Sequence, residues 1–172
     1  IQIPEARLVA YAEQLQPLIE KTQATFFEAT TCIAFQYFAE ERIDIAIIEA
    51  GMGGRLDSTN VLQPLVSVIT NVSFDHMEYL GRTLVKITRE KGGIIKRGVP
   101  CVTSSDNKVV VRTLRGIARR KRSVLVESNK RIKLSVVESR HKQFIANFQS
   151  QNLSVRNVRV GLRGIHQTTN AM

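Results

Sequence analysis

Four short, mainly apolar runs, separated by stretches with helical spacing, constrain the fold of this chain more than any other feature. The runs cover residues 43–51 (IDIAIIEAG), 65–72 (LVSVITNV), 98–104 (GVPCVTS) and 123–128 (SVLVES). Consecutive apolar positions are expected of a strand that helices cover on both faces. Strands that alternate with helices favour a parallel sheet. The sequence therefore predicts an α/β fold: a three-layer, Rossmann-like, mostly parallel sheet with helices on both faces.

Helical stretches precede and separate these runs. Residues 5–21 and 24–41 have largely apolar stripes at helical spacing, and residues 81–91 and 106–121 are helical stretches between the strands. We expect Pro17 to bend the first helix or end it early, because proline lacks a backbone N–H and clashes with the preceding turn.

The pattern changes near residue 130. Polar and apolar residues alternate in short pieces over residues 130–163, whereas residues 1–129 have the α/β pattern. The alternation predicts a small antiparallel set of strands, placed as hairpins at the edge of the parallel sheet or over one of its ends.

Composition excludes several classes of protein. The chain has 172 residues, 43% of them hydrophobic, which is enough for one globular domain and is not a disordered composition. No apolar run approaches the length of a membrane span, and the first residues have no signal-peptide pattern. Cys32 and Cys101 lie far apart without metal-ligand spacing. We therefore expect a reduced, cytoplasmic chain.

The chain is strongly basic, with a formal net charge of +10, and residues 115–122 (RGIARRKR) are its densest basic run. Such a charge suggests a nucleic-acid partner. The run contains no aromatic residue on which bases would stack. A solvated helix face, or a basic groove for an anionic small molecule, is therefore preferred to nucleic acid.

Polar residues follow two of the predicted strands. Glu49 ends the apolar part of the segment IIEAGMGGRLDSTNV (residues 47–61), and His76 follows the next strand in TNVSFDHMEYLG. Ligands bind at the carboxyl ends of parallel strands. If the two strands are neighbours, Glu49 and His76 share a divalent ion, and magnesium needs few protein ligands. The alternatives are a solvated turn glutamate and a histidine that serves as a structural donor.

The glycines do not form a known nucleotide loop. Gly51 and Gly53 begin a dinucleotide pattern, but Leu56 stands where that pattern needs glycine or alanine. The phosphate-loop motif G-x-x-x-x-G-K-[ST] occurs nowhere in the 172 residues. Lys91 ends the predicted helix 81–91, and on spacing alone it is a lysine beside the negative end of a helix.

Several ordered motifs together resemble one family. They are ATFFEATTCIAFQYF, EAGMGGRLDSTNV, VSVITNVSFDHMEYLG, ITREKGGIIKRGVP and GIHQTTNA. These motifs resemble the central domain of folylpolyglutamate synthase and dihydrofolate synthase, in the Mur ligase superfamily. The resemblance covers nearly the whole chain and is weak from about residue 105 to 160.

The resemblance implies an ATP-dependent amide ligase. In this family ATP phosphorylates the carboxylate of a folate or pteroate, and the amine of L-glutamate attacks the acyl phosphate. Magnesium ions and basic groups offset the charge that moves with the phosphoryl group. The family also implies a monomer, with ATP, L-glutamate and folate or dihydropteroate as ligands.

The resemblance also implies roles for individual residues. Glu49 and His76 match magnesium ligands, and Asp57 matches an acidic residue near substrate and metal. Lys91 matches a lysine that is carbamylated in the family, which would suit a second magnesium ion. The residues that match ligand-contacting positions are Thr25, Phe26, Phe27 and Glu28 for the pterin, Leu56 beside the same pocket, and Asn170 at the adenine of ATP.

The chain departs from the family pattern at several points. Ser58, Met77 and Gly92 replace the usual alanine, threonine and alanine, and none of these changes removes a reacting group. The family's phosphate loop and a serine-bearing magnesium loop would precede residue 1. Residues 164–172 would begin a helix that the chain does not complete, and the C-terminal domain would follow.

These departures predict that the 172 residues alone have no ligase turnover. Three hypotheses follow. The first is an incomplete central domain of a folate ligase, and the second is a catalytically dead remnant that still binds a folate or a partner. The third is a basic nucleic-acid-binding module.

Overall fold

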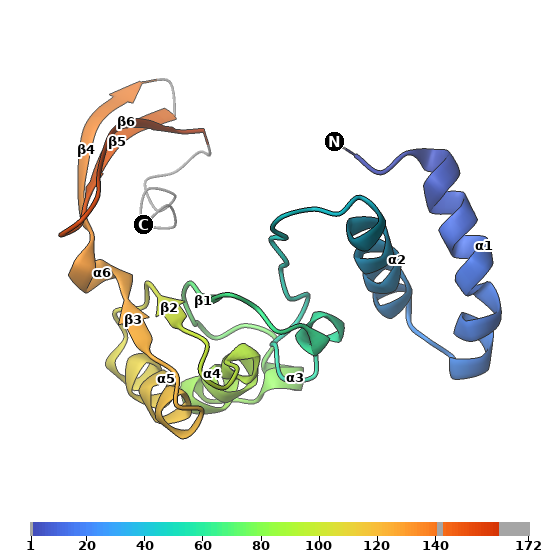
Figure 1. Ribbon diagram of the computed structural model, residues 1–172. Coiled ribbons are helices and arrows are strands. Elements are labelled where there is room, and N and C mark those ends of the chain that lie inside the picture. Colours follow the sequence, from blue (N-terminus) through green and yellow to red (C-terminus); the bar gives the residue numbers. More distant parts are fainter. Residues whose placement is uncertain (1, 141–142, 162–172) are drawn as a thin grey trace. The chain divides into compact units, whose positions relative to one another are not determined.

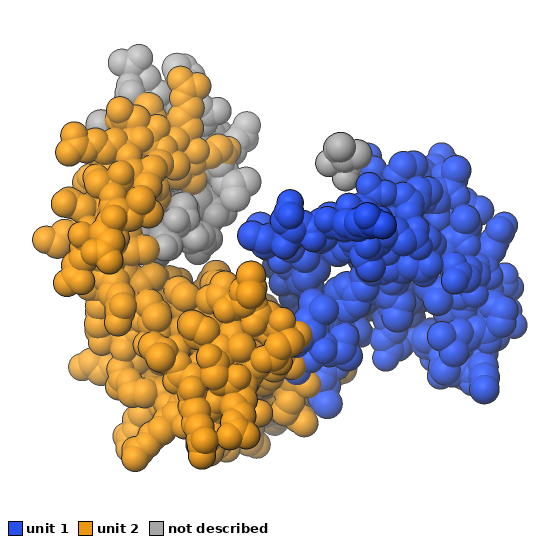
Figure 2. Space-filling model, in the orientation of Figure 1, with its two compact units in different colours: residues 1–52, 56–62 blue, residues 53–55, 63–172 orange. Residues whose placement is uncertain are grey.

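The computed structural model describes residues 2–140 and 143–161. The chain forms two compact units (Figure 2). Unit 1 comprises residues 1–52 and 56–62, and unit 2 comprises residues 53–55 and 63–172. The chain therefore passes from one unit to the other within the glycine-rich segment.

Unit 1 is helical. α1 (Glu5–Thr22) packs against α2 (Phe26–Glu40) (Figure 1). The short 3-10 helix η1 (Ser58–Val61) also contacts α2. α2 begins at a capping box: the Thr25 hydroxyl accepts the N–H of Glu28, whose carboxylate accepts the N–H of Thr25. This reciprocal pair satisfies two backbone donors and fixes the start of the helix.

A charged and aromatic cluster joins α1 to α2. The guanidinium of Arg7 pairs with the carboxylates of Glu40 and Glu41. It also lies over two rings, 5.5 Å from the centroid of Tyr11 and 5.0 Å from that of Tyr37. The cluster fixes the pairing of the two helices with directional contacts as well as apolar ones.

The expectation that Pro17 ends the first helix early is wrong, because α1 continues to Thr22. Proline removes only its own N–H from the helix ladder. The residues that follow it still donate to carbonyls one turn back, so the last turn of α1 forms.

The prediction of a strand at residues 43–51 is also wrong. These residues form no β-ladder with any described residue, and Ile45 and Ile47 are 72% and 96% exposed. A strand is stabilised by hydrogen bonds to a neighbouring strand. The described part of unit 1 contains no strand, so the apolar run has no partner there.

Unit 2 contains the parallel sheet that the sequence predicts. β1 (Ser67–Ile69), β2 (Cys101–Thr103) and β3 (Leu125–Glu127) lie in the order β1-β2-β3, and their first residues pair directly. Each strand has three residues, fewer than the apolar run that predicted it. The α/β fold class is confirmed.

Short helices alternate with these strands, as predicted. The predicted helix at 81–91 is observed from residue 84, and the one at 106–121 from residue 108. The helical elements of unit 2 are α3 (Met77–Leu80), α4 (Leu84–Lys91), η2 (Gly92–Ile94), α5 (Lys108–Arg120) and α6 (Ser128–Arg131).

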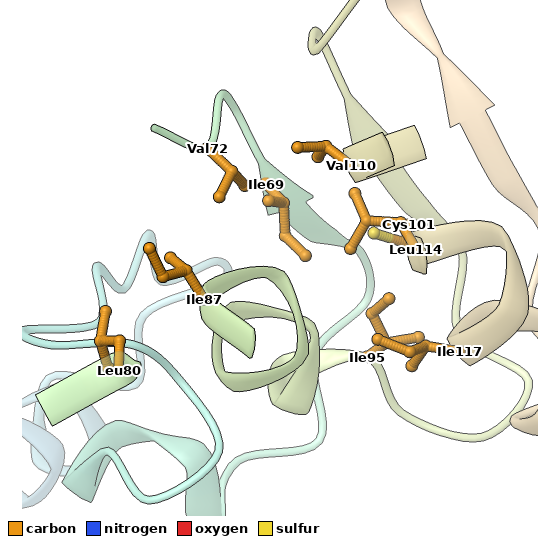
Figure 3. Close-up of a cluster of buried hydrophobic side chains, with 9 residues drawn as sticks. All are labelled: Ile69, Val72, Leu80, Ile87, Ile95, Cys101, Val110, Leu114 and Ile117. Atoms are coloured by element: carbon orange, nitrogen blue, oxygen red, sulfur yellow. The ribbon is translucent and has the colours of Figure 1, made fainter. Parts of the chain in front are cut away.

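The hydrophobic core of unit 2 lies between the parallel sheet and its helices (Figure 3). Ile87 of α4, Leu114 of α5 and Cys101 of β2 are completely buried. Burial of an aliphatic side chain contributes about 1.5–3 kcal/mol, so this cluster holds α4 and α5 against the strands. Its remaining members are Ile69, Val72, Leu80, Ile95, Val110 and Ile117.

A separate antiparallel sheet follows, as the alternating pattern predicts. β4 (Lys133–Arg140), β5 (Gln143–Gln149) and β6 (Ser154–Val160) lie in the order β4-β5-β6. Asn157 has a φ of 57°, and its N–H donates to the side-chain oxygen of Asn147 at the register shift between β5 and β6. Asparagine tolerates this left-handed conformation, so it suits the bulge. Across the described residues, no helix is long and apolar enough to cross a membrane.

Candidate functional site

In unit 1 the glycine-rich segment is held by an aromatic ring and a carboxylate. A methyl group on Gly51 would lie 2.7 Å from Cζ of Phe27, so only glycine lets the backbone approach this ring. The carboxylate of Asp57 accepts the N–H of Gly51 at 2.8 Å and the N–H of Met52 at 3.0 Å. Asp57 therefore fixes the backbone that directly follows the predicted metal ligand Glu49.

Asp57 is also the N-cap of η1, where it accepts the N–H and the hydroxyl of Thr59. Partial burial alone would raise the pKa of Asp57. Hydrogen bonds from the Thr59 hydroxyl and from the N–H groups of Met52, Thr59 and Gly51 outweigh burial and lower that pKa below its ordinary value. Asp57 is therefore a carboxylate at neutral pH.

In unit 2 the next part of the same segment packs tightly on the end of α4. Gly53 has a φ of +67°, and a methyl group on Gly54 would lie 3.0 Å from the carbonyl oxygen of Lys91. A methyl group on Gly93 would lie 2.4 Å from the Cα of Arg55. These glycines make room for protein backbone.

Arg55 ties the segment to the last turn of α4. Its backbone N–H donates to the carbonyl of Glu90 at 2.8 Å, and its guanidinium Nε lies 3.0 Å from the Glu90 carboxylate. These bonds satisfy a carbonyl at a helix end, where intrahelical partners are missing. They fix the backbone beside Lys91.

Lys91 is the last residue of α4 and is half-buried. Within the described residues its side chain makes no hydrogen bond or ion pair. A lysine at this position interacts favourably with the negative end of the helix dipole. The close approach of Gly54 to the carbonyl oxygen of Lys91 restrains the backbone of this lysine.

The predicted metal ligands belong to different units. Glu49 lies in unit 1 and is exposed, with no hydrogen bond or ion pair among the described residues. His76 lies in unit 2, has a φ of 47°, and is the N-cap residue directly before α3. Its Nε2 is 3.5 Å from a carboxylate oxygen of Asp75. The pairing of Glu49 with His76 stays a prediction.

The donor types suit magnesium. The Glu49 carboxylate, which has no partner in the part of the chain that the structure describes, and the half-exposed imidazole of His76 are each of a type that can supply one ligand to an ion that keeps several waters. Among residues 2–140 and 143–161, no three His, Cys, Asp or Glu side chains gather around one point.

The predicted pterin-contacting residues have two kinds of surroundings. Thr25 and Glu28 are engaged with each other in the capping box, and hydrogen bonds from Thr25, its backbone N–H first, lower the pKa of Glu28. Phe26 and Leu56 are 85% and 80% exposed and offer apolar surface. Phe27 packs on Gly51, so it has a structural role in addition to the predicted one. Asn170 and residues 164–172 lie outside the described residues.

Three residues that were not predicted from the sequence hold this region together: Thr59, Arg55 and Glu90. The Asp57–Thr59 spacing is a recognisable signal, because aspartate often accepts a hydrogen bond from the backbone two residues later. The contact of Arg55 with Glu90 joins segments far apart in the sequence. No local pattern indicates it.

Comparison with known proteins identifies the family. A profile of the Mur ligase middle domain matches residues 5–172. The chain belongs to this family. Dihydrofolate synthase/folylpolyglutamate synthase of Bacillus subtilis is 35% identical over 178 residues, which cover 99% of this chain and 41% of the relative. A probable dihydrofolate synthetase of Schizosaccharomyces pombe is 49% identical over 92 residues, covering 53% of this chain and 22% of the relative.

Solved structures of Mur ligase family members have the same fold as this chain. A complex of FPGS with AMPPCP has a TM-score of 0.92 and 31% identity, covering 99% of this chain and 44% of that one. Folylpolyglutamate synthase of Mycobacterium tuberculosis with ADP and AMPPCP has a TM-score of 0.88 and 30% identity. The match covers 98% of this chain and 41% of that one. The chain thus spans less than half the length of these proteins.

Proposed function

We propose that this Mur ligase middle domain is the central part of a folylpolyglutamate synthase or dihydrofolate synthase. Such an enzyme uses ATP to join L-glutamate to folate or dihydropteroate. The observation that carries the proposal is the likeness to FPGS over nearly the whole chain, including a complex with AMPPCP and folate that has a TM-score of 0.91 and 31% identity. We expect a monomeric, cytoplasmic enzyme.

The reaction consists of two transfers. The substrate carboxylate takes the γ-phosphoryl group of ATP, and ADP leaves. The glutamate amine then attacks the acyl carbon and loses a proton, so that an amide forms as phosphate leaves. In this proposal a carboxylate oxygen of Glu49 and an imidazole nitrogen of His76 would be ligands of Mg²⁺. The ion, when bound, offsets charge on the phosphoryl oxygens. Asp57, kept anionic by its hydrogen bonds, keeps the backbone after Glu49 in place.

Lys91 is proposed to act as a carbamate. Its amine would add CO₂, which replaces a cation with an anion suited to a second Mg²⁺. A half-buried amine without a described partner, at the end of a fixed helix, is compatible with that modification. Incorporation of ¹³C-labelled CO₂ that is lost in Lys91→Arg would support it.

The folate or pteroate is proposed to lie against unit 1 residues. The exposed ring of Phe26 and the exposed side chain of Leu56 would contact the pterin, and Thr25, Phe27 and Glu28 would shape the same surface. Aromatic faces stack well on a flat heterocycle. Asn170 would contact the adenine of ATP.

We expect the 172 residues alone to have no ligase turnover. The phosphate-loop motif, whose backbone N–H groups and lysine hold the β- and γ-phosphates in P-loop enzymes, occurs nowhere in them. ATP-dependent and glutamate-dependent amide formation by the purified chain would contradict this expectation.

Calorimetric titration of the chain with dihydropteroate and with folate, with and without Mg²⁺, tests the proposal. We expect Mg²⁺-dependent binding that is lost in Glu49→Ala and in His76→Ala. Glu13→Ala, which removes an exposed carboxylate of α1, is the matched control and should bind normally. Binding that does not depend on Mg²⁺ and is unchanged by both substitutions would contradict the assignment of Glu49 and His76 as metal ligands. Salt-sensitive DNA binding without folate binding would favour the basic nucleic-acid module.

A further inference from the structure

The carboxylate of Asp57 uses its two oxygens for two different contacts within unit 1. Oδ2 accepts the N–H of Gly51 at 2.8 Å and the N–H of Met52 at 3.0 Å. Oδ1 accepts the backbone N–H of Thr59 at 2.9 Å and also the Thr59 hydroxyl. An ionised carboxylate offers about four lone-pair sites, so these donors engage the whole group.

The segment that carries Glu49 has few other attachments. Among the described residues, the backbone N–H and C=O groups of residues 44–50 make no hydrogen bond. The last backbone hydrogen bond before this stretch joins the N–H of Ile43 to the carbonyl of Phe38 at 3.3 Å. The bonds from Gly51 and its neighbour to Oδ2 of Asp57 are therefore the nearest hydrogen bonds that fix the backbone of Glu49.

Thr59 determines how the Asp57 carboxylate is oriented. Rotation about the last bond of an aspartate side chain has a broad energy profile, so the side chain alone does not fix where each oxygen points. Thr59 donates twice to the same oxygen, through its backbone N–H and its hydroxyl, and so holds Oδ1 at the start of η1. With Oδ1 held there, Oδ2 faces the N–H groups of Gly51 and Met52.

We propose that Thr59 is a positioning residue for the metal ligand Glu49. Its hydroxyl orients Asp57, which holds the N–H groups of Gly51 and Met52. These two amides fix the backbone that carries the Glu49 carboxylate. Groups that orient a metal ligand commonly change metal affinity about 10- to 100-fold when they are removed. The inference rests on the proposed role of Glu49 and adds to it a residue that acts only through Asp57.

Titration of the full chain with Mn²⁺, followed by electron paramagnetic resonance of the free ion, tests the inference. Mn²⁺ accepts the same oxygen ligands as Mg²⁺. Thr59→Val keeps the branched shape and the backbone N–H but removes the hydroxyl, and we expect it to weaken Mn²⁺ binding about tenfold. Thr59→Ser restores the hydroxyl and should bind Mn²⁺ as the parent chain does.

Thr22→Val is the matched control. The Thr22 hydroxyl donates to the carbonyl of Leu18 at 2.8 Å, within the last turn of α1. Its removal therefore deletes the same chemical group from unit 1 without affecting Asp57, and Mn²⁺ binding should be unchanged.

Amide hydrogen exchange provides a second readout that needs no metal. Thr59→Val should speed exchange at Gly51 and Met52 more than its effect on global stability accounts for, whereas Thr59→Ser and Thr22→Val should not. Unchanged exchange at both amides in Thr59→Val would overturn the inference.

The two readouts separate this inference from the proposed function. Mn²⁺ binding that is lost in Glu49→Ala but unchanged in Thr59→Val would overturn the inference while the metal role of Glu49 stands. A parent chain that binds no Mn²⁺, but whose exchange responds to Thr59→Val as expected, would contradict the metal role of Glu49 and support the orientation of Asp57 by Thr59.

Discussion

The substitution Gly93→Ala tests the tight packing of the glycine-rich segment on α4. A methyl group on Gly93 would lie 2.4 Å from the Cα of Arg55 and 2.7 Å from its backbone nitrogen. Carbon atoms in contact prefer about 3.5–4.0 Å, so one of the two segments must move by roughly 1 Å. The obstructing atoms are backbone, and the hydrogen bond from the Arg55 N–H to Glu90 at 2.8 Å holds them in place.

The expected loss follows from two opposing contributions. Overpacking of this kind costs about 1–3 kcal/mol, and a clash with backbone belongs to the upper part of that range. Alanine also restricts the conformations of the unfolded chain, which by itself would raise the free energy of unfolding by about 0.4–1 kcal/mol. We therefore expect Gly93→Ala to lower the free energy of unfolding by about 2 kcal/mol.

Urea denaturation monitored by circular dichroism measures this loss as a lower midpoint at unchanged slope. Gly116→Ala is the matched control, because a methyl group there meets only an arginine side-chain nitrogen at 3.7 Å within α5. It should raise the free energy of unfolding by about 0.5–1 kcal/mol. If Gly93→Ala is as stable as the parent chain, the close approach of Arg55 to Gly93 is wrong.

Three further outcomes are expected. The pKa of Asp57 is lowered in the folded chain, so its contribution to stability is present above the unfolded pKa of about 3.9 and is lost as pH falls through the folded pKa. The stability gap between the parent and Asp57→Asn should therefore shrink below about pH 4 in acid denaturation. Burial raises the pKa of the Cys101 thiol to about 11, whereas Cys32 is exposed. A thiol reagent at neutral pH should label Cys32 quickly and Cys101 only on unfolding; rapid labelling of both would contradict that burial. Thr25→Ala removes the capping box of α2 and should lower stability by about 1 kcal/mol in urea denaturation; an unchanged midpoint would show that the cap contributes little.

Helical spacing predicted most of the helices, and the structure adds the caps that start two of them. The start of α2 is encoded by Thr25 and Glu28, which form a capping box three residues apart. The start of α5 is encoded by Asn107 in the same way, through its side chain. Caps and helical spacing depend on neighbours within one or two turns, so a single sequence is enough to find them.

Pairing between strands depends on residues that are far apart in the sequence, and the strand predicted at 43–51 was wrong for this reason. The run at 43–51 is as apolar as the one at 65–72, yet only the second forms a strand, β1. Apolar composition indicates a tendency to be buried, whereas a strand also needs a neighbour with free N–H and C=O groups. No such neighbour is described in unit 1.

In the candidate site, too, local features are visible in the sequence, whereas contacts between distant segments are not. The density of glycines after Glu49 is visible in the sequence, and in the structure these glycines lie against other parts of the protein. The groups that they approach, the ring of Phe27 and the backbone oxygens of Glu90 and Lys91, lie far from them in the sequence, and only the structure reveals them. The joint role of Glu49 and His76 stays a prediction, based on residue type and on resemblance.

The most direct test of the proposed function is ligase activity in a chimaera. The chain matches 41% of the Bacillus subtilis relative, so it can replace the matching segment of that enzyme while both flanking segments are kept. We expect this chimaera to form glutamylated folate or dihydropteroate with one ATP consumed per amide, and Glu49→Ala or His76→Ala to abolish product. A folded chimaera that binds ATP and makes no amide, beside an active Bacillus subtilis control, would contradict the proposed function and favour the remnant that only binds.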